Sequence, residues 1–219
     1  MSSREDILGR VRAGLERSAT NAAAARAEML AALSDRSHGP KPAIDCAPRA
    51  LLDRFRAKSE ALSSTVDAVA READVPAAVA RYLMGMKLAK SAVAWPALAA
   101  LDWAAAGLAV EGRGARGDDL VGITGCFCAI AETGTLMLCS SPATPAAVSL
   151  LPETHIALVH AARIVPYMED AWALARQELG ALPRAVNFIS GPSRTGDIEQ
   201  TIVLGAHGPY RVHLVIVES

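Results

Sequence analysis

Residues 156–189, IALVHAARIVPYMEDAWALARQELGALPRAVNFI, contain the clearest evidence for the type of fold. Short apolar runs at 156–160 and 185–189 have the length of buried strands. Between them, residues 167–179 predict a helix with one apolar face, which is made of Ala171, Trp172, Ala175 and Leu179. Short buried strands that alternate with helices are typical of an α/β domain with a mostly parallel sheet.

The same alternation extends from this stretch toward both ends of the chain. Apolar residues at helical spacing mark 50–61 and 76–87, where Pro76 suits the first position of a helix. Further extended runs are expected at 65–69, 91–95, 108–111, 134–139 and 210–217. The pattern therefore predicts a single α/β domain from about residue 50 to the C-terminus.

The N-terminal part of the chain has a different pattern. Helical spacing is found near the start and again over residues 21–33, which are rich in alanine. Residues 34–48 then contain one glycine and three prolines, a composition that ends helices. We therefore divide the chain into an N-terminal helical appendage with its linker, residues 1–45, and an α/β domain, residues 46–219.

Composition and charge exclude several classes of protein. With 52% hydrophobic and 21% charged residues, the chain can form a packed core. A net charge of −1 and only three residues each of Phe, Trp and Tyr leave no basic, base-stacking surface for nucleic acid. The start of the chain lacks the apolar core of a signal peptide, and prolines interrupt the uncharged stretch 133–151. We expect a cytoplasmic protein without membrane insertion or nucleic-acid binding.

The four cysteines do not form a metal-binding motif. Cys126, Cys128 and Cys139 lack the paired spacing of zinc and iron–sulfur sites, and no histidine cluster completes a ligand set. In a cytoplasmic protein these thiols and Cys46 are expected to be reduced. The sequence therefore predicts neither a metal site nor a cofactor.

One acidic residue stands out between residues 120 and 152. Glu132 is the only Asp, Glu, Lys or Arg in that stretch, and it lies just before an expected strand. An acid in such apolar surroundings is expected to be partly buried and then paired, protonated or hydrogen-bonded. Two interpretations stay open: a structural carboxylate at a turn, or a functional acid (nucleophile, general base or ligand-binding group) at the end of a strand, beside a ligand held by Thr133 and Gly134.

A second candidate site is the loop ISGPSRTGDIE, residues 189–199. Backbone N–H groups at the start of a helix, together with hydroxyls and a guanidinium, are suited to a phosphate or a carboxylate. A helix is expected to begin near Asp197. The alternatives are a purely structural capping box from Asp197 to Gln200 and a solvated arginine. The expected ligand-binding residues are Ser190, Gly191, Ser193, Arg194 and Thr195.

The third candidate is the turn GAHGP, residues 205–209. His207 stands between two glycines and could face a pocket, where it would act as a proton donor or hydrogen-bond partner. Gly208 would let the backbone approach a ligand closely. The alternative is a loop histidine without a role.

These motifs, in this order, resemble the lactate-utilisation protein C family, whose members consist of a LUD domain. The resemblance runs from about residue 50 to the C-terminus. One departure is that the family pattern often has an arginine after a proline at the position where Ala146 follows Pro145. The similar segments are ITG at 123–125, AIAETGT at 129–135, SLLP at 149–152 with His155, the loop 189–199 and the turn 205–209.

The resemblance implies a fold, a role and partners. The fold would be a three-layer α/β/α arrangement like that of the superfamily of ribose-phosphate isomerase, glucosamine-phosphate deaminase (NagB/RpiA) and CoA transferases. The role would be beside two partner proteins, one or both carrying iron–sulfur clusters, in the oxidation of L-lactate to pyruvate. The segment Glu132-Thr133-Gly134 is also similar to the motif of CoA transferases in which a glutamate attacks a thioester.

Three hypotheses follow. In the first, which we prefer, the chain is a non-redox subunit of a lactate-oxidising system that binds a small carboxylate, a phosphorylated ligand or a partner surface. In the second, it is a transferase or isomerase that uses Glu132 as nucleophile or base beside the anion-binding loop. In the third, it is an interaction or regulatory module whose N-terminal helices mediate assembly, either into a homo-oligomer or with a partner protein.

Overall fold

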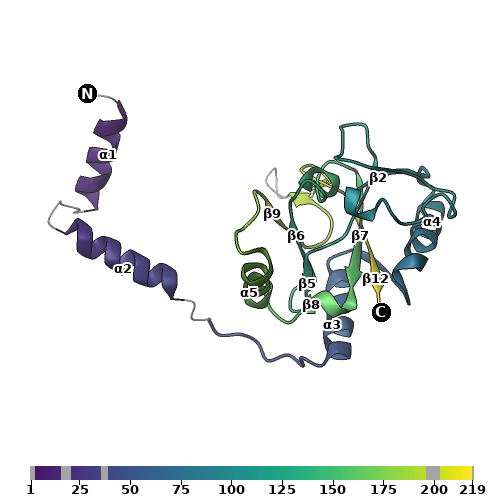
Figure 1. Ribbon diagram of the computed structural model, residues 1–219, viewed down its shortest axis with the longest axis horizontal. Coiled ribbons are helices and arrows are strands. Elements are labelled where there is room, and N and C mark those ends of the chain that lie inside the picture. The colour runs from purple at the N-terminus through teal and green to yellow at the C-terminus, as the bar shows by residue number, and fades with distance from the viewer. Residues whose placement is uncertain (1–2, 16–20, 36–38, 196–202, 219) are drawn as a thin grey trace. The chain divides into compact units, whose positions relative to one another are not determined.

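The computed structural model describes residues 3–15, 21–35, 39–195 and 203–218. The chain divides into two compact units, Met1–Pro42 and Ala43–Ser219. The first unit contains α1 (Ser3–Gly14) and α2 (Ala22–Ser34), drawn in purple in Figure 1, and neither helix buries a residue. The helix expected near residue 197 lies outside the described residues.

The second unit is built on a six-stranded main sheet in which every neighbouring pair of strands is parallel. This finding confirms the expected α/β class. Five strands lie where extended runs are expected, and the sixth, β4, is not among the expected runs. In sheet order the strands are β1 (Thr65–Val69), β12 (Arg211–Val217), β7 (Thr154–His160), β4 (Val121–Thr124), β2 (Ser91–Ala94) and β3 (Ala109–Gly112).

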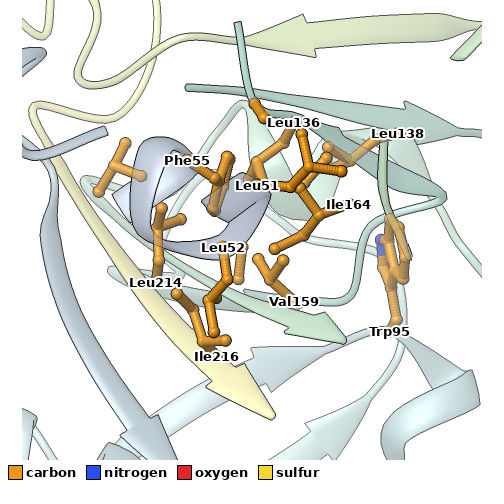
Figure 2. Packing of buried hydrophobic residues seen from close by; sticks show 14 of the residues in the cluster. Leu51, Leu52, Phe55, Trp95, Leu136, Leu138, Val159, Ile164, Leu214 and Ile216 are labelled. Carbon is orange, nitrogen blue, oxygen red and sulfur yellow. The ribbon is translucent and has the colours of Figure 1, made fainter. Parts of the chain in front are cut away.

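Two helices cover the two faces of the main sheet, α3 (Pro48–Ala61) on one and α4 (Val75–Gly85) on the other. Because successive side chains of a strand point to opposite faces, β7 serves both cores. Its Ala157 and Val159 join the cluster with α3, whereas Ile156 and Leu158 join the cluster with α4. Figure 2 shows the α3 side, where Leu51, Leu52 and Phe55 meet Leu214 and Ile216 of β12.

A second, four-stranded sheet packs on the α3 side of the main sheet. Its order is β8 (Ile164–Val165), β5 (Cys128–Ile130), β6 (Thr135–Cys139) and β9 (Val186–Ile189), and β6 runs antiparallel to both neighbours. Helix α5 (Met168–Leu179) covers its outer face, with Ala171 and Ala175 in contact with Cys128, Ile130 and Met137. The layers α5, second sheet, main sheet and α4 follow one another from left to right in Figure 1.

Residues 156–189 contribute to both sheets. The first strand of that stretch lies in the main sheet, whereas its last strand, β9, pairs with β6 in the second sheet. The β–α–β order is therefore right, but the two strands do not share a sheet. The expected three-layer arrangement of α4, main sheet and α3 is present, and the second sheet and α5 extend it.

Short elements complete the second unit. Strands β10 (Arg194–Thr195) and β11 (Val203–Leu204) form an antiparallel pair. The 3-10 helices are η1 (Glu72–Asp74), η2 (Pro96–Leu98), η3 (Ala146–Ser149) and η4 (Ala161–Arg163). Among the described helices, none is both long and apolar enough to cross a membrane.

Because all six strands of the main sheet are parallel, the sheet has one amino edge, where they begin, and one carboxyl edge, where they end. Residues before β7 and β12 lie at the amino edge. Residues after β2, β4 and β7 lie at the carboxyl edge. Each edge has a cleft.

Candidate functional site

One cleft at the amino edge, at the starts of β7 and β12, brings together several of the residues that the sequence singles out. This amino-edge cleft has a volume of about 150 Å³. Ser190, Gly191, Ser193, His207 and Gly208 all line it, so the loop at 190–193 and the turn at 205–209 lie side by side there. The other lining residues are Ser149, Leu150, Phe188, Ile189, Pro209 and Val212.

Backbone hydrogen bonds hold the loop and the turn together. The N–H of Ser193 donates to the carbonyl of Pro209 at 2.8 Å, and the N–H of Gly205 donates to the carbonyl of Ser193 at 2.9 Å. These two bonds fix Ser193 against the turn that presents His207, whose side chain is exposed. The cleft is therefore lined by the hydroxyl of Ser193 and the imidazole of His207, on two segments that are joined by backbone hydrogen bonds.

A chain of hydroxyls links the Glu132 turn to this cleft. The Oγ1 atoms of Thr133 and Thr135 lie 2.8 Å apart, and Thr135 Oγ1 lies 2.7 Å from Ser190 Oγ. Glu132 itself is half-buried, and its backbone N–H donates to the carbonyl of Pro166 at 3.0 Å. Thr133 is thus connected to the cleft, whereas the carboxylate of Glu132 is not among the groups that line it.

Two of the predicted site glycines serve the packing of α3. Gly134 and Gly191 have φ angles of +68° and +78°. A Cβ at Gly134 would lie 2.6 Å from the backbone nitrogen of Ser59, and one at Gly191 would lie 2.4 Å from the carbonyl oxygen of Leu62. Only glycine combines the left-handed conformation with such a close approach. Both positions are therefore needed to seat the end of α3, whether or not a ligand binds.

Arg194 and Thr195 are not among the residues that line the amino-edge cleft. The Nη2 atom of Arg194 donates to the carbonyl of Leu62 at 3.3 Å and to the hydroxyl of Ser63, just after α3. Thr195 belongs to β10, where it pairs with Val203. The guanidinium predicted to hold an anion is thus engaged with the backbone that follows α3.

Two histidines of the main sheet are buried and neutral. Nε2 of His155 lies 2.8 Å from the hydroxyl of Thr124, and Nδ1 of His213 lies 2.9 Å from the hydroxyl of Thr65. The ring of His213 also stacks on Tyr82 with centroids 3.8 Å apart. Burial lowers the pKa of each histidine to about 4, although Asp67 opposes this shift at His213. His155, part of the family resemblance, is thus a core residue.

A larger cleft opens at the carboxyl edge, and the sequence does not predict it. This carboxyl-edge cleft has a volume of about 560 Å³ and lies between the ends of β2, β4 and β7 and the ends of β6 and α5. Its residues come from several segments that share no motif, so only the known topology brings them together. They are Trp95, Cys126, Phe127, Cys139, Ser140, Ser141, Thr144, His160, Arg163, Glu178, Leu179, Ala181 and Pro183.

The charged groups of the carboxyl-edge cleft are paired with each other. Arg163 donates from Nη1 and Nη2 to the two carboxylate oxygens of Glu178, at 2.7 and 2.9 Å. This pairing lowers the pKa of Glu178 and raises that of Arg163. Burial raises the pKa of Cys126 to about 12, so this thiol is protonated at neutral pH. Among the described residues, no group of three or more His, Cys, Asp or Glu could hold a metal ion.

The fold defines the class of the protein as an α/β domain with a parallel main sheet. The sequence profile of the LUD domain family matches residues 52–217. The match covers well over half of the chain, and the chain therefore belongs to the LUD domain family. The recognition made from the motifs is confirmed.

Curated relatives share the name that the resemblance suggested. The chain is similar to lactate utilization protein C of Bacillus licheniformis, with 39% identity over 102 residues, 45% of this chain and 42% of the relative. It is also similar to lactate utilization protein C 1 of Bacillus mycoides, with 43% identity over 108 residues, 48% of this chain and 46% of the relative. The matched stretch thus spans less than half of the length of these relatives.

One solved structure has the same fold. It is the crystal structure of a DUF162 family protein from Deinococcus radiodurans, with a TM-score of 0.61 and 24% sequence identity. The similarity covers 80% of this chain and all of that chain. At this identity the comparison supports the fold alone.

Proposed function

We propose that this protein is a non-redox subunit of an L-lactate utilisation system, and that it holds a small carboxylate in the amino-edge cleft. The role is supported by membership of the LUD domain family and by relatives named lactate utilization protein C. The observation that supports the site is the convergence of Ser193 and His207 on one small cleft. Iron–sulfur proteins as partners and a cytoplasmic location remain predictions from the sequence.

The size and chemistry of the amino-edge cleft suit a small hydroxy or keto acid. Its volume of about 150 Å³ leaves room for a few water-sized groups rather than a nucleotide or a coenzyme. Hydroxyl groups and an imidazole N–H can donate hydrogen bonds to a carboxylate and to a neighbouring hydroxyl or carbonyl oxygen. Leu150 and Val212 would contact the methyl end of such a ligand.

The geometry gives less support to the transferase or isomerase hypothesis. That mechanism needs Glu132 as nucleophile or base and Arg194 as anion ligand in a single cleft. Glu132 is not a lining residue, and Arg194 donates to Leu62 and Ser63. A ligand of the amino-edge cleft would instead meet Ser193 and His207.

Calorimetric titration of the purified full chain with L-lactate and pyruvate tests the site. We expect His207→Ala and Ser193→Ala each to weaken binding about tenfold, because each removes a hydrogen bond to a charged ligand. The control is His160→Ala, which removes a half-exposed histidine from the carboxyl-edge cleft and should leave the affinity unchanged. Equal affinity in all three variants would exclude the amino-edge cleft as the site.

Activity and growth measurements test the role. The isolated chain should not reduce an artificial electron acceptor with L-lactate as donor, and turnover of lactate by the pure chain would contradict a non-redox subunit. Deleting the gene in the organism that encodes it should abolish growth on L-lactate, and the wild-type gene should restore growth. A tagged chain purified from lactate-grown cells should bring with it a protein with the visible absorbance of an iron–sulfur cluster.

A further inference from the structure

The carboxyl-edge cleft has the position and size of a small-molecule site. In open α/β sheets, ligands bind outside the carboxyl ends of the strands. Here the cleft adjoins the ends of β2, β4 and β7, and its volume of about 560 Å³ falls within the usual range for small-molecule pockets. Nothing in the proposed function uses this cleft.

The walls of the cleft are mainly apolar and held in place. Trp95 lies at one end of the core cluster in Figure 2, and its indole N–H donates to the carbonyl of Pro145 at 3.0 Å. The guanidinium of Arg163 lies over the ring of Phe127, 4.9 Å from its centroid. Leu179 and Pro183 complete an apolar lining suited to a flat ring.

The opposite charges of Arg163 and Glu178 offset each other within the cleft. Besides its two bonds to Glu178, Arg163 donates from Nε to the carbonyl of Phe127 at 2.9 Å. The cleft is also lined by His160, whose Nε2 atom lies 3.9 Å from a carboxylate oxygen of Glu72. A charged ligand would lose hydration and would have to displace an existing partner, so an uncharged ligand is favoured.

The two thiols reinforce this neutral character. Cys126 and Cys139 both line the cleft, and burial raises the pKa of each. Both are therefore protonated at neutral pH and contact a ligand as small, polarizable apolar groups. Neither provides the thiolate that a covalent or metal-binding role would require.

One hydroxyl of the cleft has a proton to donate. The hydroxyls of Ser141 and Thr144 bond each other at 2.9 Å, and Thr144 also donates to the carbonyl of Cys139 at 2.8 Å. The hydroxyl of Ser140, in contrast, accepts a hydrogen bond from the N–H of Ala185 at 2.9 Å. Its own proton can therefore be donated to an acceptor atom of a ligand.

We propose that the carboxyl-edge cleft binds an uncharged aromatic molecule that has a carbonyl oxygen, with the ring against Trp95 and Phe127 and the oxygen accepting from Ser140. The apolar walls favour an aromatic ring, and the pairing of Arg163 with Glu178 favours a ligand without charge. The free proton of the Ser140 hydroxyl favours a ligand with an acceptor oxygen. This site is separate from the amino-edge cleft, and its ligand does not depend on the role in lactate utilisation.

Fluorescence titration of the full chain tests the proposal with prodan, an uncharged naphthalene ketone whose emission shifts to shorter wavelength in an apolar site. We expect saturable binding at one site per chain. Ala181→Trp places a large ring in the cleft from an exposed loop position and should weaken binding at least tenfold. Ala173→Trp, on the exposed face of α5 and outside the cleft, is the matched control and should bind as the wild type does.

Two further comparisons separate this proposal from unspecific apolar binding. Anilinonaphthalene sulfonate, a similar ring system with a negative charge, should bind at least tenfold more weakly than prodan. Ser140→Ala should weaken prodan binding about fivefold to tenfold through loss of one hydrogen bond, while thermal melting shows that the variant is folded. Equal prodan binding by Ala181→Trp, or tighter binding of the sulfonate, would overturn the proposal, as would absence of prodan binding to the wild type.

Discussion

The two edges of the main sheet differ in how their residues are used. At the amino edge, the loops at 189–195 and 205–209 are rich in glycine and hydroxyl residues, and many of their groups bond each other or contact α3. At the carboxyl edge, residues without any motif form a cleft several times larger. Motif-like sequence is therefore concentrated where the backbone is tightly constrained, and the larger space lies elsewhere.

The difference shows what a motif signals in a single sequence. Gly134 and Gly191 stand out because a left-handed backbone and the close approach to α3 both require glycine. Arg194 and Thr135 stand out in the same motifs and have partners within the protein. Such residues mark a structural junction. Of the ten predicted site residues, Ser190, Gly191, Ser193, His207 and Gly208 also line a cleft there.

The largest effect that we expect concerns pH and the buried histidines. His155 and His213 have pKa values of about 4 in the folded protein, below the ordinary value of 6.5. The unfolded chain therefore binds more protons between these values, so the folded state loses stability as the pH falls through 6.5, down to about 4. Each histidine contributes up to about 3 kcal/mol to this loss.

Urea denaturation between pH 7.5 and pH 4 measures this dependence. His213→Phe keeps a ring to stack on Tyr82 and should remove about half of it. An unchanged slope in the His213 variant would show that the loss arises elsewhere.

The next effect tests whether the predicted site glycines are structural. Gly134→Ala brings a Cβ within 2.6 Å of a backbone atom at φ +68° and should cost about 3 kcal/mol or more of unfolding free energy. Gly107→Ala is the matched control, because its φ is +71° and a Cβ there would have no atom within 4 Å. It should cost about 1 kcal/mol. Similar losses in the two variants, measured by urea denaturation, would show that contact with α3 is unimportant.

The smallest effect distinguishes the two interpretations of Arg194. Since its guanidinium donates to Leu62 and Ser63, Arg194→Ala should lower stability by about 1 kcal/mol or less. The same variant should bind L-lactate as the wild type does, in contrast to His207→Ala. Calorimetry that showed a tenfold loss of affinity would instead make Arg194 a ligand-binding residue, as the loop sequence by itself predicts.

Much of the fold could be predicted from the sequence because buried helices and strands have apolar residues at characteristic spacings. The strands at 65–69, 154–160 and 211–217 are five to seven residues long and apolar, and each agrees with its expected run to within two residues. Strands β4, β5 and β8 have only two to four residues each. Strand β4 includes a glycine, and β5 includes a cysteine and an alanine. Their pairing, rather than their composition, makes them strands.

The pattern of apolar residues along the chain was enough to predict the α/β class and the helical character of the N-terminal part, and the short motifs were enough to recognise the family. The fold class and the helices follow from the spacing of apolar residues along the chain, and the family follows from short motifs. None of these features requires knowing which distant segments touch. The tertiary structure alone decided that β9 pairs with β6, that Glu132 and Arg194 do not line the amino-edge cleft, and that Trp95, Ser140 and Arg163 share another cleft. The physical reason is that these neighbours are set by contacts between segments far apart in the sequence. Such contacts produce no regular spacing of residues along the chain.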